Sequence, residues 1–423
     1  MLHHIFKQVW AQRKYNTWIL IELILVFVLA WYIVDYSFVL MYNRSIPEGY
    51  DTQNTFLIRY DVLPNSSRQY NPQEADPITM FDNVQRFMDA VRAFPGVEYS
   101  TFVDQYTGSY PYAGSYSNGS IGIDSSEFYI HMRNIQSTDY FRIFRFTSLQ
   151  DNSFERLAQI DLRTGNKLII SQYAARKLFP EGSAIGQPVK MHDKHYIVAE
   201  VTYDQKRFDF FQPEPAAFVY KAITPENFSD FAIAIRVKED IPEELFIERF
   251  YDEMNNKLKI GNLYLDGIDS FSQIRIDMED GLTNEIRTRT ALMIFFLLNM
   301  GLGVIGTFWF RNQTRKSEIG LRMALGSNRK KLQFQLVLES VLLLTAAMIP
   351  ALLIIFGAVQ ADLIGTLGAY STDSGLITAN KWLRFLITAG ITYILLAVIV
   401  AISAWIPAHQ ASKVHPVEAL RDE

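Results

Sequence analysis

The sequence has 423 residues, a formal net charge of −5 and 20% charged residues, values that on average fit an ordinary soluble protein. The average is misleading, because residues 41–289 carry 26 Lys and Arg against 36 Asp and Glu, whereas the rest carries 14 against 9. The chain has no cysteine, which excludes disulfides and every Cys-based metal or redox site. A net acidic balance gives no reason to expect a nucleic-acid partner.

Four long apolar stretches dominate the hydropathy pattern, and 250 mostly polar residues separate the first from the second. About 20 helical residues, at a rise of about 1.5 Å each, cross the hydrocarbon core of a bilayer. Each stretch reaches that length. The sequence therefore predicts transmembrane helices over residues 17–40, 290–310, 334–357 and 383–406.

Lys and Arg gather at those ends of the expected helices that must share one side of the membrane. They precede the first helix, fill residues 311–333 and follow the fourth helix in the tail 407–423. Short basic loops stay in the cytoplasm, so both termini and the 311–333 loop are expected there. Residues 41–289 and the short loop 358–382 then face the other side, with Lys381 and Arg384 as exceptions to the rule. We expect a multi-pass protein of the inner (cytoplasmic) membrane.

Residues 1–16 have apolar side chains at i, i+3, i+4, i+7 and i+8, a spacing that predicts a short amphipathic helix at the inner interface. The alternative is a plain flank of a start-transfer anchor. No small-residue cleavage site follows the first apolar stretch, so we interpret it as an uncleaved anchor.

Residues 41–289 mix strand and helix patterns without regular alternation, which predicts an α+β periplasmic domain. Strands are expected at 55–60, 168–170, 189–191, 196–201, 216–220 and 231–237, and helices at 78–94, 172–179 and 242–258. Residues 105–130 are rich in Tyr, Ser and Gly and predict a long loop or irregular hairpins. The domain can contain two lobes, with a boundary inside 95–130. Residues 274–290 predict a stalk helix that continues into the second transmembrane helix.

Two ordered motifs lie in the expected cytoplasmic segments. The first is Arg315-Lys-Ser-Glu-Ile-Gly-Leu-Arg-Met-Ala-Leu-Gly-Ser327, and the second runs from Pro407-Ala-His-Gln-Ala411 to Pro416-Val-Glu-Ala-Leu-Arg421. Together they resemble the permease subunits of the FtsX/MacB-type (type VII) ABC transporters. The resemblance implies ATPase coupling through Glu318, Ile319, Gly320, Arg322, Ala324, Leu325 and Gly326. It implies a family tail motif at Pro407, Pro416, Glu418, Ala419, Leu420 and Arg421. The segments 168–179, 185–189 and 196–201 are similar to the family's periplasmic domain.

The physical chemistry of the first motif fits a coupling helix at the membrane surface. Ser317 can cap a short helix whose first turn holds Glu318, and Gly326 can end it in the left-handed conformation. Apolar residues between them give a surface that a cytoplasmic ATPase can hold. The alternative is a basic loop that only orients the transmembrane helices.

The resemblance also implies the partners. No Gly is followed by Lys, so the sequence has no phosphate-binding P-loop, and we expect ATP to be bound by a separate cytoplasmic ATPase subunit. We expect no enzyme activity and no cofactor in this chain. A second copy of the permease or a paralogue completes the unit, often with a periplasmic adaptor and an outer-membrane channel. The implied work is efflux or extraction of drugs, peptides or lipoproteins.

Two other functions stay open: a regulator of a periplasmic cell-wall hydrolase, and an antimicrobial-peptide sensor that works with a two-component system. An ectoenzyme is disfavoured, because residues 41–289 show no nucleophile–base pattern. Several weaker signals have simpler interpretations. Gly301-Leu-Gly-Val-Ile-Gly306 lies inside an apolar stretch, where small residues let helices approach. His192 and His195 fit a solvated hairpin tip, and Glu22 and Glu339 a structural role near the cytoplasmic face. The tyrosines between 106 and 116 either meet a ligand or pack on each other.

Overall fold

The computed structural model describes residues 13–106, 109–113, 117–123, 126–238, 241–314, 328–361 and 380–411. The side chains of 13–16, 312–314, 329, 407, 408, 410 and 411 are not described. Two compact units result: a helical unit of residues 1–42 and 285–423, and an inserted domain of residues 43–284. Both boundaries lie within five residues of the expected limits 41 and 289.

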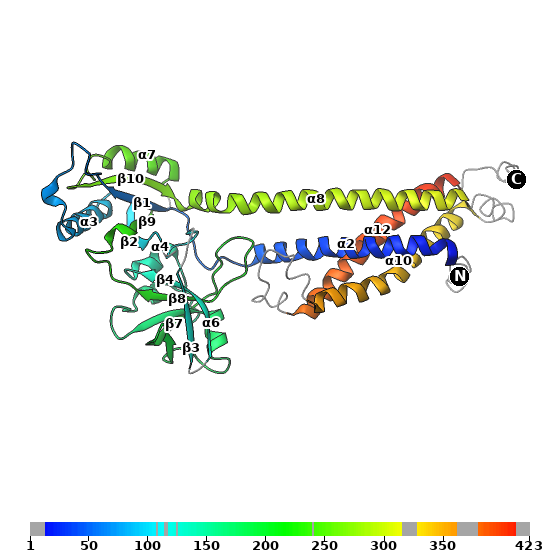
Figure 1. The fold of residues 1–423 in the computed structure, drawn as a ribbon, viewed down its shortest axis with the longest axis horizontal. Coiled ribbons are helices and arrows are strands. Elements are labelled where there is room, and N and C mark those ends of the chain that lie inside the picture. The colour runs from blue at the N-terminus through cyan, green and yellow to red at the C-terminus, as the bar shows by residue number, and fades with distance from the viewer. Residues whose placement is uncertain are drawn as a thin grey trace. The chain divides into compact units, whose positions relative to one another are not determined.

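The helical unit contains four long helices (Figure 1), α2 (Arg13–Ser45), α8 (Phe271–Thr314), α10 (Arg329–Gln360) and α12 (Lys381–Ala411). All four are long and apolar enough to cross a membrane. Each contains one of the four predicted transmembrane stretches and extends beyond it. α8 runs through Gly281 without interruption, so the helix predicted from residue 274 onward is continuous with the second apolar stretch.

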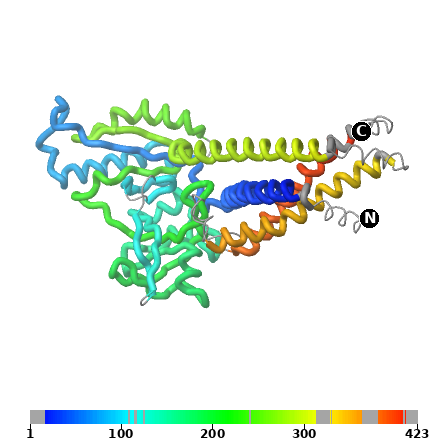
Figure 2. The backbone as a smooth tube through the Cα atoms, turned by 45° about the vertical axis from the view of Figure 1, so that its right-hand side comes forward, coloured from blue at the N-terminus to red at the C-terminus, as the bar shows by residue number. Residues whose placement is uncertain are grey.

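A single apolar cluster joins the four helices, whose backbones are traced in Figure 2. Its fully buried members include Phe27 of α2, Phe308 of α8, Leu343 of α10 and Val400 of α12. α8 takes the smallest part, because only 11% of its apolar window is buried, against 28–33% for the other three. Most of α8 therefore presents apolar side chains to its surroundings.

The inserted domain is α+β, as predicted, and its strands form one ten-stranded sheet. Four antiparallel strands lie in the order β10 (Leu263–Ser270), β1 (Thr55–Val62), β9 (Phe231–Val237) and β2 (Val97–Asp104). The helices α3 (Pro77–Arg92) and α7 (Glu243–Met254) share an apolar core with these strands. The short 3-10 helices η1 (Pro72–Glu74) and η2 (Phe228–Asp230) complete this lobe.

Capping and apolar spacing explain why α3 begins at Pro77 and which of its sides is buried. The side chain of Asp76 accepts a hydrogen bond from the Thr79 backbone N–H, and Pro77 occupies the first helical turn, where its missing N–H costs nothing. Val84, Phe87 and Val91 recur at helical spacing and are all fully buried. The predicted helix 78–94 is thus present over almost its whole length.

The other six strands close into a small barrel. β4 (Ser126–Ile135) pairs with β3 (Ser117–Ile123) and β8 (Ala216–Tyr220), and β7 (Lys194–Thr202) pairs with β6 (Pro188–Met191) and β5 (Lys167–Ser171). The pairs β3–β6 and β5–β8 complete the ring. α6 (Gln172–Leu178) follows β5, and α4 (Asp139–Phe144) and α5 (Phe154–Ala158) pack beside the barrel. Val103 of β2 pairs with Ile135 of β4 and joins the two lobes.

Several sequence predictions for this domain were incomplete. Residues 105–130 were expected to be a long loop or irregular hairpins, but they include β3 and the first half of β4, which form a regular antiparallel hairpin. The strands β2 and β10 and the helices α4 and α5 were not predicted. The chain passes between lobes twice, between Asp104 and Ser117 and again between Tyr220 and Phe231, whereas one boundary was expected.

Candidate functional site

The predicted coupling residues lie outside the described part of the chain. Glu318, Ile319, Gly320, Arg322, Ala324, Leu325 and Gly326 fall in 315–327, and Pro416, Glu418, Ala419, Leu420 and Arg421 fall after residue 411. Pro407 belongs to α12, but its side chain is not described. The structure describes the two helices on either side of the first motif. α8 ends at Thr314, and α10 begins at Arg329, where the side chain of Asn328 accepts a capping hydrogen bond from the Lys330 backbone N–H.

A buried ion pair joins the last turn of α8 to the first third of α10, the two helices on either side of the predicted coupling motif. Arg311 Nη2 in the last turn of α8 lies 2.5 Å from Glu339 Oε1 in α10, and the side chains are 9% and 5% exposed. Sequence analysis counted Arg311 with the basic loop and left Glu339 without a partner. Because both side chains are buried, the guanidinium of Arg311 offsets the cost of burying the Glu339 carboxylate. The pair therefore links α8 to α10 within the helical unit.

Two polar contacts tie α10 to α12, the helix that leads to the tail motif. Gln333 Nε2 lies 3.3 Å from His409 Nδ1, and the hydroxyls of Thr345 and Tyr393 lie 2.9 Å apart. Between the two helices is an open apolar groove of about 400 Å³, lined by Lys330, Gln333, Phe334, Val337, Ala401, Ile402 and Trp405. Polar contacts thus link α8 with α10 and α10 with α12.

Other polar contacts involve α2. Arg384 Nε of α12 donates to Asp35 Oδ1 at 2.8 Å, and the side chains are 17% and 3% exposed. This pairing explains why Arg384 departs from the basic-side pattern: it neutralises a carboxylate buried among helices. Thr307 of α8 donates to Glu22 Oε2 at 2.8 Å, so Glu22 also has a structural partner.

The inserted domain holds the exit of α2 and the start of α8 together through a network that we call the joint: Asn43, Glu48, Lys206, Asp209, Arg275 and Glu279. Arg275 pairs with Glu48 at 2.8 Å and with Asp209, and it lies 3.6 Å from Glu279. The Asp209 backbone N–H donates to Glu279 at 2.9 Å. The first three turns of α8 are thereby fixed to the loop 205–214.

Lys206 ties the same loop to the end of α2. Its Nζ donates to the carbonyls of Asn43 and Asp209, both at 3.1 Å, and Asn43 Nδ2 donates to the Phe210 carbonyl at 2.9 Å. Lys206 is only 2% exposed, and this desolvation lowers the pKa of its ammonium group from the ordinary value. None of these partners is distinctive in sequence, because they come from segments more than 60 residues apart.

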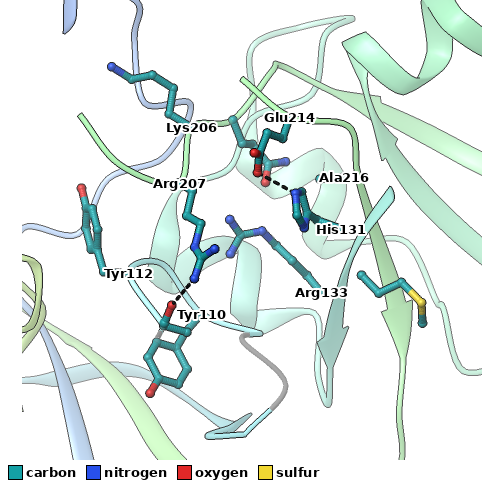
Figure 3. A pocket seen from close by; sticks show the side chains of 11 residues that line it. Tyr110, Tyr112, His131, Arg133, Lys206, Arg207, Glu214 and Ala216 are labelled. Carbon is teal, nitrogen blue, oxygen red and sulfur yellow. Dashed lines mark hydrogen bonds and ion pairs between the residues drawn. The ribbon is translucent and has the colours of Figure 1, made fainter. Parts of the chain in front are cut away.

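A pocket borders the joint (Figure 3). It is lined by Tyr110, Tyr112, Ala113, His131, Met132, Arg133, Gln205, Lys206, Arg207, Glu214 and Ala216. Its cavity measures about 30 Å³, far below the few hundred Å³ of a drug-sized site. In this conformation the pocket can admit a small group rather than a whole drug molecule.

The described tyrosines of the Tyr-rich loop have different roles. Tyr112 is 2% exposed and donates to Glu48 at 2.6 Å, and Tyr110 packs edge-on against Phe271 with ring centroids 5.7 Å apart. Tyr106 is 68% exposed, and Tyr116 lies outside the described residues. Tyr110 and Tyr112 thus pack within the domain, the second of the two interpretations offered by the sequence.

The structure also describes His192 and the glycines between 301 and 306, to which the sequence analysis gave no functional role. His192 and Asp193 form the exposed β6–β7 turn with φ values of 45° and 61°. Gly301, Gly303 and Gly306 lie in α8, and an added Cβ would meet at most ordinary van der Waals contacts. Close approach of helices within one chain therefore does not account for these glycines.

Four apolar helices and an inserted α+β domain define a multi-pass membrane protein, and comparison with known families specifies which kind. Residues 24–249 match the MacB-like periplasmic core domain, and residues 290–416 match the FtsX-like permease C-terminal family. The first match alone covers more than half of the chain. The chain belongs to the FtsX/MacB-type family of ABC transporter permeases, and these proteins reside in the inner membrane.

Individual relatives are distant. The macrolide export ATP-binding/permease protein MacB of Bdellovibrio bacteriovorus is 26% identical over 60% of this chain, which spans 38% of that protein. The uncharacterized ABC transporter permease YvrN of Bacillus subtilis is 25% identical over 67% of this chain and 68% of its own length. The periplasmic region of MacB from Actinobacillus actinomycetemcomitans covers 55% of this chain and 94% of that structure, with 12% identity and a TM-score of 0.34.

Proposed function

We propose that this chain is the permease subunit that couples ATP hydrolysis by a separate cytoplasmic ATPase to rearrangement of the inserted domain. The ordered motif from Glu318 to Gly326 carries the proposal, supported by the buried Arg311–Glu339 pair that brackets it. ATP is bound by the partner, because the chain itself contains no Gly-Lys step for a P-loop.

The proposed transmission uses α8 as a lever. A 44-residue helix is about 66 Å long at about 1.5 Å per residue, and its first turns carry Arg275 and Glu279 of the joint. Movement of the ATPase displaces the coupling segment, and the Arg311–Glu339 pair makes the last turn of α8 and the first third of α10 move together. The helix then carries the displacement to the joint.

The proposed transport is efflux or extraction of drugs, peptides or lipoproteins from the outer side of the membrane. Relatives whose names describe macrolide export favour this over hydrolase regulation or peptide sensing. We place both termini in the cytoplasm and the inserted domain outside. A second permease, identical or paralogous, would cover the exposed face of α8, and an adaptor with an outer-membrane channel would extend the path.

The test uses the full chain purified in nanodiscs together with its co-purifying ATPase. Glu318→Lys and Gly320→Trp are expected to reduce ATP hydrolysis to the level of the ATPase alone. Glu248→Lys makes the same charge reversal on the exposed face of α7 and is expected to leave stimulation unchanged. Full stimulation in both motif variants would contradict coupling through this segment.

A further inference from the structure

The apolar groove between α10 and α12 changes character along its length. Its five apolar lining residues lie inside the predicted transmembrane stretches 334–357 and 383–406, whereas Lys330 and Gln333 precede the first of these stretches. The apolar stretches end where the hydrocarbon core of a membrane meets its polar surface. The groove therefore runs across that boundary, with one end in the apolar layer and the other among polar groups.

The apolar end of the groove is open to the surroundings of the helical unit. The side chains of Phe334, Ile402 and Trp405 are all more than half exposed, although they line a concave surface. Apolar side chains at this depth face acyl chains rather than water. The volume of about 400 Å³ lies within the range of about 300–1,000 Å³ that is typical of small-ligand pockets. The groove can therefore hold part of one acyl chain.

The polar end of the groove carries positive charge. Lys330 lines the groove and is exposed, and the adjacent Lys331 is exposed as well. The seven described lining residues include no Asp or Glu. Residues 311–333 as a whole contain seven Lys and Arg against the single acidic residue Glu318. A basic segment immediately outside a transmembrane helix attracts anionic lipid headgroups.

An indole ring lies between the two ends. The ring of Trp405 stacks on the ring of His409 with centroids 5.4 Å apart, and the Gln333–His409 contact joins the two helices at the same end. An indole combines an apolar body with one N–H donor, and tryptophan is enriched at the level of lipid headgroups for this reason. The position of Trp405 therefore agrees with a headgroup at this end of the groove.

The two ends together restrict the kind of molecule that fits. Lipid tails are as apolar as the interior of a helix pair, so the apolar end alone gives little preference among membrane components. The preference has to come from the polar end, where Lys330 favours a negative group. A zwitterionic phospholipid brings a second positive charge to this site, and an apolar molecule leaves the lysine without a counter-charge. An acyl chain joined to an anionic headgroup matches both ends.

We propose that the groove between α10 and α12 binds one anionic phospholipid. One acyl chain lies along Phe334, Val337 and Ile402, and the phosphate accepts hydrogen bonds from the Lys330 ammonium group. The bound lipid contacts both helices, of which α10 follows the predicted coupling segment and α12 leads to the predicted tail motif. The lipid therefore adds a link between α10 and α12 at the end where Gln333 and His409 meet.

The test measures binding without ATP, so that it is independent of coupling to an ATPase. The full chain, freed of lipid in detergent, is titrated with palmitoyl-oleoyl phosphatidylglycerol or with the phosphatidylcholine that has the same chains. Native mass spectrometry gives the fraction of chains that carry one lipid. Phosphatidylglycerol is expected to bind at least about fivefold more tightly, because a basic residue near the headgroup contributes about that factor.

A charge variant tests the polar end. Lys330→Gln is expected to weaken the binding of phosphatidylglycerol about fivefold and to leave that of phosphatidylcholine unchanged. Lys381→Gln removes the same charge from an exposed site at the other end of α12 and should bind as wild type does. Equal losses in the two variants would show that any positive charge suffices and would overturn the assignment to this groove.

A filling variant tests the apolar end. Ile402→Trp places a larger ring in the groove and is expected to abolish the preference for phosphatidylglycerol, because the chain can no longer enter. Ile354→Trp is the matched control, since Ile354 of α10 is 54% exposed, as Ile402 is, but does not line the groove. Equal affinities of the wild-type chain for the two lipids, or wild-type binding in both Lys330→Gln and Ile402→Trp, would overturn the proposal. If Ile402→Trp fails to fold, Lys330→Gln at its exposed site decides the question alone.

Discussion

The helical unit and the inserted domain both contain buried charges, but they neutralise them differently. In the inserted domain the buried carboxylates of Glu200 and Asp104, 2% and 1% exposed, pair with bases that are 42% and 35% exposed. In the helical unit both partners of the two ion pairs that join different helices are largely shielded, at 9% and 5% exposed for Arg311–Glu339 and at 17% and 3% for Arg384–Asp35.

The surrounding medium explains the difference. A basic side chain at the surface of a water-exposed domain can pair with a buried acid and keep part of its hydration. A helix surrounded by lipid has no such surface, so the cation must also lie between helices. The Arg311–Glu339 and Arg384–Asp35 pairs therefore connect helices of the helical unit, whereas the pairs of Glu200 and Asp104 link the interior of the inserted domain to its surface.

The comparison assumes that the inserted domain lies in water on the side opposite the coupling segment. The chain has no native cysteine, so single cysteines can report this without background. Tyr129→Cys, at a site 81% exposed, is expected to react fully with a membrane-impermeant maleimide in spheroplasts. Lys330→Cys at the start of α10 should react only after lysis. The opposite labelling pattern would invert the topology.

Removing one partner of an ion pair between helices should cause the next largest effect, a loss of unfolding free energy. Arg311→Met removes the guanidinium that pairs with the buried Glu339 carboxylate and is expected to cost about 3–5 kcal/mol of unfolding free energy. The double variant Arg311→Met/Glu339→Leu should recover most of this loss, because it removes both charges. Unfolding in mixed micelles measures both.

The control is an exposed pair of the inserted domain. Arg249 and Glu253 lie one turn apart on α7 with side chains 49% and 42% exposed, so Arg249→Met should cost less than about 0.5 kcal/mol. An equal loss at Arg311 and Arg249 would remove the distinction between the two regions.

A matched pair of apolar substitutions makes the comparison sharper. Leu168 in the barrel and Leu343 in α10 are both completely buried. Leu168→Ala should cost about 2–5 kcal/mol, because the side chain is transferred from water on folding and leaves a cavity. Leu343→Ala should cost less, because lipid is as apolar as the helix interface. Local opening free energies from hydrogen exchange test this, and a larger loss at Leu343 would contradict it.

Much of the fold could be predicted from the sequence, and the elements that were missed lack a clear local pattern. The transmembrane helices follow from the length of the apolar stretches, and α3 follows from the helical spacing of its apolar residues. β4 was missed because it is bounded by Ser and Gly turn signals and carries His131 and Arg133, which face a pocket rather than a core.

Only part of the candidate site could be predicted from the sequence. The coupling motif is an ordered local string, so it is visible in the sequence. The ion pairs between helices and the joint depend on partners far apart in the chain, such as Asp35 with Arg384 or Asn43 with Lys206. No local sequence pattern identifies these partners. These contacts form only when the helices and the loop 205–214 pack together.

The central claim is that a displacement at the coupling segment reaches the inserted domain. Spin labels at Tyr129→Cys and Trp18→Cys, sites that are 81% and 74% exposed, can test it in the complex with the ATPase. We predict that trapping the ATP-bound state shifts the distance distribution between the labels in the wild-type background and leaves it unchanged in Glu318→Lys. Identical distributions with and without ATP in the wild-type background would contradict the account.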